Sequence, residues 1–354
     1  MKNKFFILLI ISQFFLFNFI YGDDFTFESS QIDLIDKGNI IKASGGVKAL
    51  SSDGIEIISD EAIYDKKKST LKAFGKVKIK EFNNKVEISA DEIIYNKKLG
   101  TIISSKQNEQ VLLTDKENNI EIFADKIKYE INENLISSYG NILANIENKF
   151  SISTEELIHD RNLMKVYSSE KAEIKDKLKN IIGIESFEIK INQKILKANK
   201  ITLLDPQNNK YSLENSMVNL NTNEILGKDV KIDFDNSLFG NEKNEPRVRG
   251  KSVVYDENQT TIYKGTFTTC KKNKDKCPPW SIYADEVKHK KKEKIIEYKN
   301  AWLEIYDKPI VYFPYFYHPD PTVKRQSGFL MPSIANSTKS GNSVNIPYFF
   351  ALAD

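Results

Sequence analysis

A repeat of about 30 residues runs through most of this chain and limits what it can fold into. Its copies are SDEAIY from Ser59, ADEIIY from Ala90, ADKIKY from Ala124, TEELIH from Thr154 and ADEVKH from Ala284, with a weaker copy, ANKITL, from Ala198. The acidic position falls at Asp60, Asp91, Asp125 and Glu155, so successive copies stand 31, 34 and 30 residues apart. A fixed period of this size is typical of stacked supersecondary units, none of which can bury its apolar face alone.

Apolar and polar residues alternate in the runs around these copies. In the clearest runs, two apolar residues flank a single charged one: Val77 and Ile79, Val86 and Ile88, Ile120 and Ile122. Period two places both members of such a pair on one face of a strand, and Gly and Asn residues separate the runs. The sequence therefore predicts an all-β chain with a continuous apolar stripe.

Two interpretations of the stripe stay open. A sheet that curls without closing would line a groove for acyl chains, and the lipid-binding candidates are then Val77, Ile79, Val86, Ile88, Ile120 and Ile122. A closed β-solenoid would use the same residues as its packed core. In the open form, the first and last strands would be unpaired edges that can recruit a strand from another chain.

The recurring acidic pairs do not indicate an enzyme. A catalytic pair of carboxylates occurs once, at a site, whereas these recur with the structural period, which places them at a bend of each unit. His159, His289 and His318 are scattered along the chain, and Ser327 lies in Gln-Ser-Gly-Phe rather than in a nucleophile elbow. We therefore expect no catalytic centre, no cofactor and no metal site.

The N-terminus and the charge balance indicate the compartment. A basic head at Lys2 and Lys4, an apolar run from Phe5 and a small residue at Gly22 predict a secretory signal peptide over residues 1–22; an uncleaved membrane anchor is the alternative. Without the two leader lysines, the 52 basic residues become 50 against 49 acidic ones. That balance argues against a nucleic-acid surface, which needs a concentrated basic face.

The chain has two cysteines, Cys270 and Cys277. In an exported protein a pair of this kind is a candidate disulfide. Zinc is a weaker interpretation, because there is no second cysteine pair.

The C-terminal segment follows different rules from the repeats. Eight of the ten prolines lie between Pro278 and Pro347, together with a dense group of aromatic residues from Tyr312 to Tyr317. Proline fixes φ and donates no backbone hydrogen bond, so such a group is expected to end or redirect strands. Tyrosine and phenylalanine side chains in this arrangement suit a membrane–water interface. The segment therefore predicts a junction between two β architectures.

The motifs of this segment, in order, resemble the LptD (OstA/Imp) family of lipopolysaccharide-assembly proteins. The resemblance begins at Cys277 and Trp280 and includes Asn300-Ala-Trp302-Leu. Its junction motif comprises Pro309, Tyr312, Pro314, His318, Pro319, Asp320, Arg325, Ser327, Gly328 and Pro332. The 30-residue repeats upstream resemble the OstA-type β-jellyroll that this family shares with its periplasmic relatives.

The resemblance implies a domain plan: a signal peptide over 1–22, periplasmic OstA-like jellyroll repeats over 23–290, a proline and aromatic junction over 291–335, and the incomplete start of an outer-membrane β-barrel over 336–354. It also implies non-catalytic transport of lipopolysaccharide from an LptA-like periplasmic jellyroll bridge into a barrel plugged by an LptE-like lipoprotein, at the outer membrane of a Gram-negative cell. The alternative is a soluble periplasmic lipopolysaccharide carrier or scaffold.

Overall fold

The computed structural model describes residues 18–21, 25–147, 150–175, 181–204, 208–236, 244–272, 278–320, 323, 327–329, 333–337 and 341–352. Over these residues the chain is almost entirely β-strand, with one short 3-10 turn, η1, at Asp36–Gly38. Within the same ranges no helix combines the length and the apolarity needed to cross a membrane. The chain divides into two compact units, Met1–Ser168 and Ser169–Asp354, a division that the sequence did not indicate.

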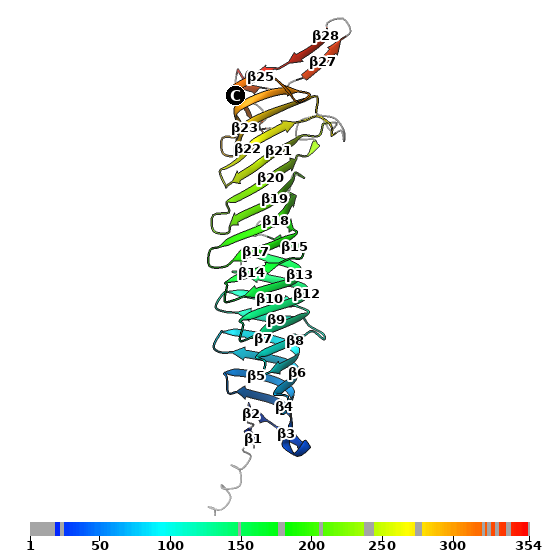
Figure 1. Ribbon diagram of the computed structural model, residues 1–354, viewed down its shortest axis with the longest axis vertical. Helices are drawn as coiled ribbons and strands as arrows, with labels where there is room; N and C mark the ends of the chain where they lie inside the picture. Colours follow the sequence, from blue (N-terminus) through cyan, green and yellow to red (C-terminus); the bar gives the residue numbers. More distant parts are fainter. Residues whose placement is uncertain are drawn as a thin grey trace, which may run out of the picture. The chain divides into compact units, whose positions relative to one another are not determined.

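The first unit is a ladder of antiparallel strands that follow one another in chain order (Figure 1). Its strands are β1 (Asn18–Tyr21), β2 (Phe25–Ser29), β3 (Gln31–Ile35), β4 (Ile40–Ser51), β5 (Ile55–Asp65), β6 (Thr70–Glu81), β7 (Val86–Asn96), β8 (Thr101–Ser105), β9 (Val111–Asp115), β10 (Ile120–Ala124), β11 (Lys126–Glu130), β12 (Leu135–Ile146), β13 (Phe150–Asp160) and β14 (Lys165–Ser168). β7 pairs along its length with β8 and then β9, and β12 pairs in the same way with β10 and β11.

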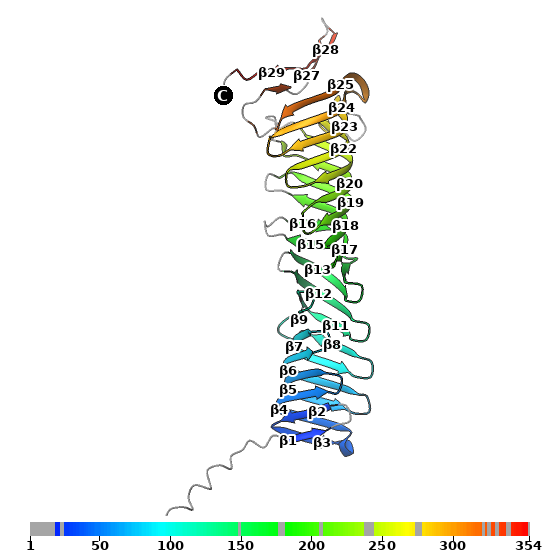
Figure 2. The ribbon, with the colours of Figure 1, turned by 90° about the vertical axis from the view of Figure 1, so that its left-hand side faces the viewer.

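The second unit continues with antiparallel pairing of chain neighbours from β18 to β25 (Figure 2). Its strands are β15 (Ala172–Lys175), β16 (Ile181–Ile184), β17 (Ser186–Lys190), β18 (Ile195–Leu204), β19 (Lys210–Asn219), β20 (Ile225–Asp233), β21 (Arg247–Tyr255), β22 (Gln259–Thr268), β23 (Trp280–Lys290), β24 (Ile295–Ile305), β25 (Lys308–Pro319), β26 (Gly328–Phe329), β27 (Ser333–Ser337), β28 (Gly341–Asn345) and β29 (Tyr348–Phe349). β26 pairs with β29, and β27 pairs with β28.

The long strands of the first unit bend near their middle, where the pairing register slips. In the first unit the slips lie between Ser44 and Val47, between Phe74 and Val77, and between Tyr139 and Ile142. A bulge of this kind bends the strand and changes its twist, so one strand contributes to two faces of the ladder. The predicted all-β jellyroll is confirmed.

The repeated acids lie at these bends, as the sequence predicted. Gly75 has a φ of 75° and lies against Asp60; a Cβ atom added at Gly75 would overlap the Asp60 carboxylate. Gly140, with a φ of 76°, meets Asp125 in the same way: a Cβ atom added there would lie 2.9 Å from Asp125 Oδ2. Glycine adopts this left-handed conformation without the clash that a Cβ causes. The bend therefore explains both the glycine and the acid of the repeat.

The pairing also bears on the proposed domain boundaries. β24 pairs with β23 residue by residue across position 290, and β25 continues the ladder to Pro319. Pro314 lies inside β25, whereas Pro309 is the second residue of the strand, beside a register shift, and Pro319 is its last. Among the described residues β25 pairs with β24 alone, so it is an edge strand of the ladder. Proline, which lacks an N–H group, is tolerated on an edge strand. The predicted junction over 291–335 thus begins within the ladder.

We predict that Gly75→Ala lowers the free energy of unfolding by about 3 kcal/mol, because a left-handed alanine is strained and its Cβ displaces Asp60. Gly46→Ala is the matched control: Gly46 has a φ of 85° but nothing within 4 Å of its Cβ position. It should lose only about 1 kcal/mol. Urea titration followed by circular dichroism measures both; equal losses would contradict the role given to Asp60.

Candidate functional site

The six lipid-binding candidates lie together on the inner face of the first unit. Ile79 pairs directly with Ile88, Ile88 with Leu113, and Leu113 with Ile122. This row of cross-strand neighbours continues to Ala144 and Ile152. Val77, Val86 and Ile120 lie in adjacent rows on the same face. The period-two pattern thus identified side chains that share one surface.

This inner face is closed in the first unit. All six candidates are at most 1% exposed, and three large side chains, Tyr64, Tyr95 and Tyr129, are buried just as completely. Their partners in alternation, Lys78, Glu87 and Glu121, lie on the other face and are reached by solvent. In this conformation the stripe of the first unit packs against protein, and an acyl chain could reach it only if the two faces separated.

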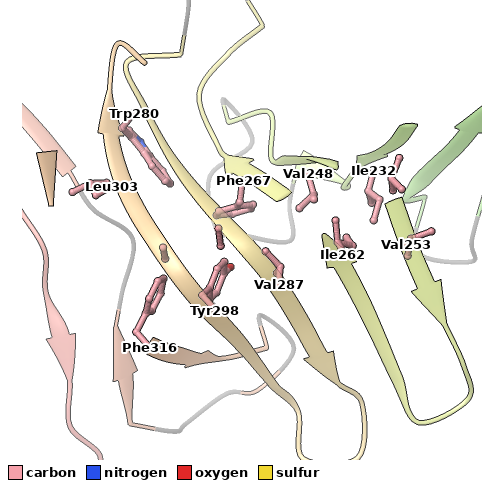
Figure 3. Packing of buried hydrophobic residues seen from close by; sticks show 13 residues of the cluster. Ile232, Val248, Val253, Ile262, Phe267, Trp280, Val287, Tyr298, Leu303 and Phe316 are labelled. Carbon is pink, nitrogen blue, oxygen red and sulfur yellow. The ribbon is translucent and has the colours of Figure 1, made fainter. Parts of the chain in front are cut away.

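The inner face of the second unit is less tightly closed. Its core comprises Val230, Ile232, Val248, Val253, Ile262, Phe267, Trp280, Ala284, Val287, Tyr298, Ala301, Leu303 and Phe316 (Figure 3). Apolar side chains that are only partly buried pack against this cluster, among them Leu213, Ile282, Ile296, Val311 and Phe313. The sequence did not identify these residues as an inner face, and it assigned Phe313 to an interfacial aromatic group. Alternation in Lys210–Asn219 and Lys308–Pro319 was the available signal, but interruptions such as Pro314 weakened it.

Polar contacts link the interior of the first unit to several of its turns. The last position of the repeat motif supplies an aromatic side chain that reaches a turn more than 40 residues earlier in the chain. The Tyr95 hydroxyl donates to Asp53 Oδ2 at 2.7 Å, and the Tyr129 hydroxyl accepts from Asn84 Nδ2 at 3.1 Å. The aromatic residue of the repeat therefore fixes a turn as well as filling the core.

His159 occupies the same repeat position in β13 but makes no such bond. Its side chain is fully buried, and neither ring nitrogen has a hydrogen-bond partner. Its Nε2 lies 3.8 Å from Oδ2 of Asp115, which is also fully buried. The Asp115 carboxylate is bound by Arg161 instead, whose Nε donates to Oδ2 at 2.7 Å. Nη2 of Arg161 donates to the Asn84 carbonyl oxygen at 2.8 Å.

These contacts set the protonation states of the group. Burial lowers the pKa of His159 to about 4, and the nearby Asp115 carboxylate only partly opposes this shift. Burial alone would raise the pKa of Asp115, but hydrogen bonds from Arg161 and Asn118 outweigh it and the pKa is lowered. Burial raises the pKa of Tyr129 to about 12. At neutral pH the site therefore holds a neutral histidine beside a buried Arg161–Asp115 ion pair.

We predict that the protein loses stability as the pH falls from 6.5 to 4. The pKa of His159 is near its ordinary value of 6.5 in the unfolded state and about 4 in the folded state. Between these pH values the unfolded state binds a proton that the folded state does not bind, so protonation favours unfolding. The loss amounts to about 3 kcal/mol over this window. Thermal melts at half-unit pH steps measure it, and His159→Phe should flatten the slope.

Tyr129→Phe serves as the control for the histidine variant. It removes the hydroxyl contacts with Asn84 and Asn134 and lowers stability at every pH, but it leaves the titrating group in place. Its slope between pH 6.5 and 4 should match that of the unaltered protein. An unchanged slope in His159→Phe would show that another group is responsible.

The junction motif is divided between two faces of β25. Phe313 and Phe316 belong to or pack against the inner cluster, and Phe316 stacks on Tyr298 with ring centroids 4.4 Å apart. Tyr312, Tyr315 and Tyr317 point the other way and are 41–51% exposed. The sequence grouped these aromatic residues as one interfacial set. The structure places them in two, because the pairing and the alternation of β25 are interrupted at Pro314.

The polar residues of the junction anchor β25 to its neighbours. The Tyr298 hydroxyl lies 3.0 Å from Nε2 of His318, whose Nδ1 donates to the Pro319 carbonyl oxygen at 2.7 Å. Burial lowers the pKa of His318. Asp320 contacts His289 Nε2 at 2.6 Å. The structure thus brings together residues that the sequence named separately.

The remaining junction residues are incompletely described. Gly328 packs against Pro319, and the Ser327 hydroxyl accepts a hydrogen bond from the backbone N–H of Ala351 at 2.9 Å. Arg325 and Pro332 lie outside the described residues. So does Cys277, the predicted partner of Cys270; Cys270 is a free, half-buried thiol in this structure, with Sγ 3.8 Å from the Trp280 carbonyl oxygen. The disulfide stays a prediction.

Comparison with known proteins supports the same family. The family model for OstA-like proteins matches residues 28–139. The chain is also similar to proteins named LPS-assembly protein LptD. It is 31% identical to the LptD of Pseudoalteromonas translucida over 137 residues. This alignment covers 37% of this chain and 18% of the relative. The protein of Shewanella frigidimarina is 36% identical over 103 residues, 29% of this chain and 13% of the relative.

These matches concern a limited part of the relatives. The LptD of Shewanella denitrificans, 32% identical over 143 residues, is covered over 18% of its length, so the chain matches less than a fifth of each of these three proteins. Among solved structures, the chain aligns with LptH of Pseudomonas aeruginosa, the LptA-homologous periplasmic component of the lipopolysaccharide transport device. The alignment covers 33% of this chain and 82% of LptH. The TM-score is 0.29 at 12% identity, a likeness too distant to support an inference. The resemblance to LptD is confirmed by the family model and by these relatives.

Proposed function

We propose that this chain is a non-catalytic component of lipopolysaccharide transport and assembly at the outer membrane. Support comes from the match to the family model for OstA-like proteins at residues 28–139 and from the similarity to LPS-assembly proteins LptD. The jellyroll would lie in the periplasm after removal of the signal peptide, and residues 336–354 would begin a barrel in the membrane. The partners would be an LptA-like jellyroll upstream and an LptE-like lipoprotein in the barrel.

The observation that carries the proposal is that each unit has an apolar inner face. In the first unit it is the row from Ile79 through Ile88 to Ile122; in the second it is the cluster around Phe267 and Tyr298. Burial of one acyl chain of about ten methylenes on such a face is worth on the order of 8 kcal/mol. Sugars and phosphates of the lipid would stay in water.

The degree of closure indicates where the lipid is held. Ile282 and Phe313 are partly buried in the second unit, whereas the candidates in the first unit are completely covered. We infer that acyl chains contact the second unit without rearrangement and reach the first only when its two faces part. The exposed Tyr312, Tyr315 and Tyr317 would lie at the membrane–water interface.

Site-specific photo-crosslinking tests this function. A photoreactive residue at Ile282, on the inner face, should form an adduct with lipopolysaccharide in cells with active transport. Its neighbour Tyr283 points to the other face and is the matched control; it should give at least about tenfold less adduct, because alternate residues of a strand face opposite sides. Ile79 and Lys78 form a second such pair in the first unit.

Two results would contradict the proposal. Equal labelling at Ile282 and Tyr283 would mean that contact does not depend on the inner face. Labelling at neither position, in cells whose transport is shown to be active, would mean that the stripe is only a packed core. Adducts that form equally well when the chain ends before residue 320 would favour the soluble carrier instead.

A further inference from the structure

A pocket with three cationic side chains in its walls lies at the bend of β20, β21 and β22 in the second unit. Its volume is about 270 Å³, and its lining includes Asp229, Lys231, Arg249, Lys264 and Thr266. Lys231 pairs with Arg249, and Arg249 with Thr266, so these three form one cross-strand row. Their neighbours Ile232 and Val248 belong to the inner core. Lys231, Arg249 and Thr266 therefore lie on the face opposite the apolar stripe, while Val230 of the inner core also lines the pocket.

The guanidinium group of Arg249 is held in place by the protein. Its Nη1 donates to the Ile232 carbonyl oxygen at 3.0 Å and to the Val248 carbonyl oxygen at 2.8 Å, and its Nη2 donates to Asp233. A guanidinium carries five N–H donors, so two are left for another acceptor. Arginine oriented in this way is suited to binding phosphate.

The two lysines of the pocket are not neutralised at short range. Lys264 makes no ion pair or side-chain hydrogen bond with any residue that the structure describes. Lys231 Nζ lies 3.9 Å from Glu214, a long contact with both side chains about half exposed. With Arg249 they bring three positive charges to the lining. Two carboxylates oppose them at short range: Asp229 in the lining and Asp233, the ion-pair partner of Arg249.

The repeat itself shows that this bend is unusual. At other bends, an acid on one strand meets the bend residue of the next: Asp125 bonds Asn141, Glu185 pairs with Lys200 at 2.8 Å, and Asp285 bonds Asn300.

In β21 the position of the acid is occupied by Lys251, which follows Gly250 of the pocket lining. Lys251 lies opposite Lys264, where the pairing is interrupted between the pairs Arg249–Thr266 and Ser252–Tyr263 without a change of register. Like charges on facing strands destabilise a sheet. An anion bound at the pocket would offset that repulsion.

We propose that this pocket binds a phosphate group. Arg249 would supply the oriented N–H donors, Lys231 and Lys264 the additional charge, and Thr266 a hydroxyl donor. Asp229 would accept a hydrogen bond from a hydroxyl of the same ligand, which favours a phosphate carried by a hydroxylated molecule over a dense polyanion. A sugar phosphate and the glycerol phosphate of a phospholipid headgroup share this chemistry.

The proposal stands independently of the acyl-chain path, because Lys231, Arg249 and Thr266 lie on the face opposite the apolar stripe. Binding of a lipopolysaccharide phosphate at the pocket would rest on the proposed function. Lipopolysaccharide adducts at Ile282 should persist when the pocket is altered, so failure of one proposal would not be mistaken for failure of the other.

Calorimetry on the full chain at constant ionic strength tests the pocket with three probes: inorganic phosphate, glucosamine 1-phosphate, and phosphatidylcholine vesicles containing phosphatidylglycerol. The double variant Lys231→Gln/Lys264→Gln should bind the preferred probe at least about tenfold more weakly, since two charge-assisted contacts are lost. The matched control is Lys72→Gln/Lys78→Gln, two exposed lysines of β6 in the first unit.

The three probes distinguish the sources of the phosphate. Binding of glucosamine 1-phosphate indicates a saccharide ligand, binding of vesicles alone a membrane headgroup, and equal binding of inorganic phosphate a site for the free ion. Each supports the pocket only if Lys231→Gln/Lys264→Gln weakens it and the control does not. Absence of binding by all three probes, or equal affinities in the two double variants, would overturn the proposal.

Discussion

The bend in each long strand is the constraint on which the rest of this structure depends. A ladder of straight antiparallel strands would give one flat sheet, with no enclosed face for its valines and isoleucines. A residue at positive φ, such as Gly75 or Gly140, bends the strand where the pairing register slips. The acid on the neighbouring strand, Asp60 or Asp125, packs against that residue. Because the same bend recurs in successive strands, the interior formed on one side of it is continuous.

The two units use this scheme with different degrees of closure. In the first unit large tyrosines fill the interior, and Tyr95 and Tyr129 tie their hydroxyls to turns on other strands. In the second unit, inner residues such as Ile282 and Phe313 stay partly buried. A surface that is to receive an acyl chain cannot be completely covered by protein. The second unit therefore suits lipid contact as it stands, and the first unit must open.

The first unit contains a buried polar group, His159, Asp115 and Arg161, whose histidine makes its stability depend on pH. Arg161 and Asp115 form an ion pair that is shielded from water. The attraction between the two charges offsets the cost of removing them from water only when their geometry is close. His159 lies beside them in the position where other repeats carry tyrosine, and it has no partner for either nitrogen. The same repeat position thus produces a stabilising contact in two strands and a titratable weak point in a third.

Local pattern in the sequence was enough to determine the strands, the bends and the inner face. Period two placed Ile79, Ile88 and Ile122 on one surface, and the recurrence of Asp60 and Asp125 indicated a structural rather than a catalytic role. Both depend on spacing along the chain, which the backbone converts directly into position.

Tertiary structure alone decided the closure of the interior, the division at Ser168 and the split of the aromatic segment between two faces of β25. It also decided which charges meet, as in Arg161 with Asp115, 46 residues apart, and Lys231 with Arg249 and Lys264 around one pocket. These features depend on how closely separate strands pack and on which side chains face each other across a bend. No residue carries that information by itself, because it arises only when the register of every strand is fixed.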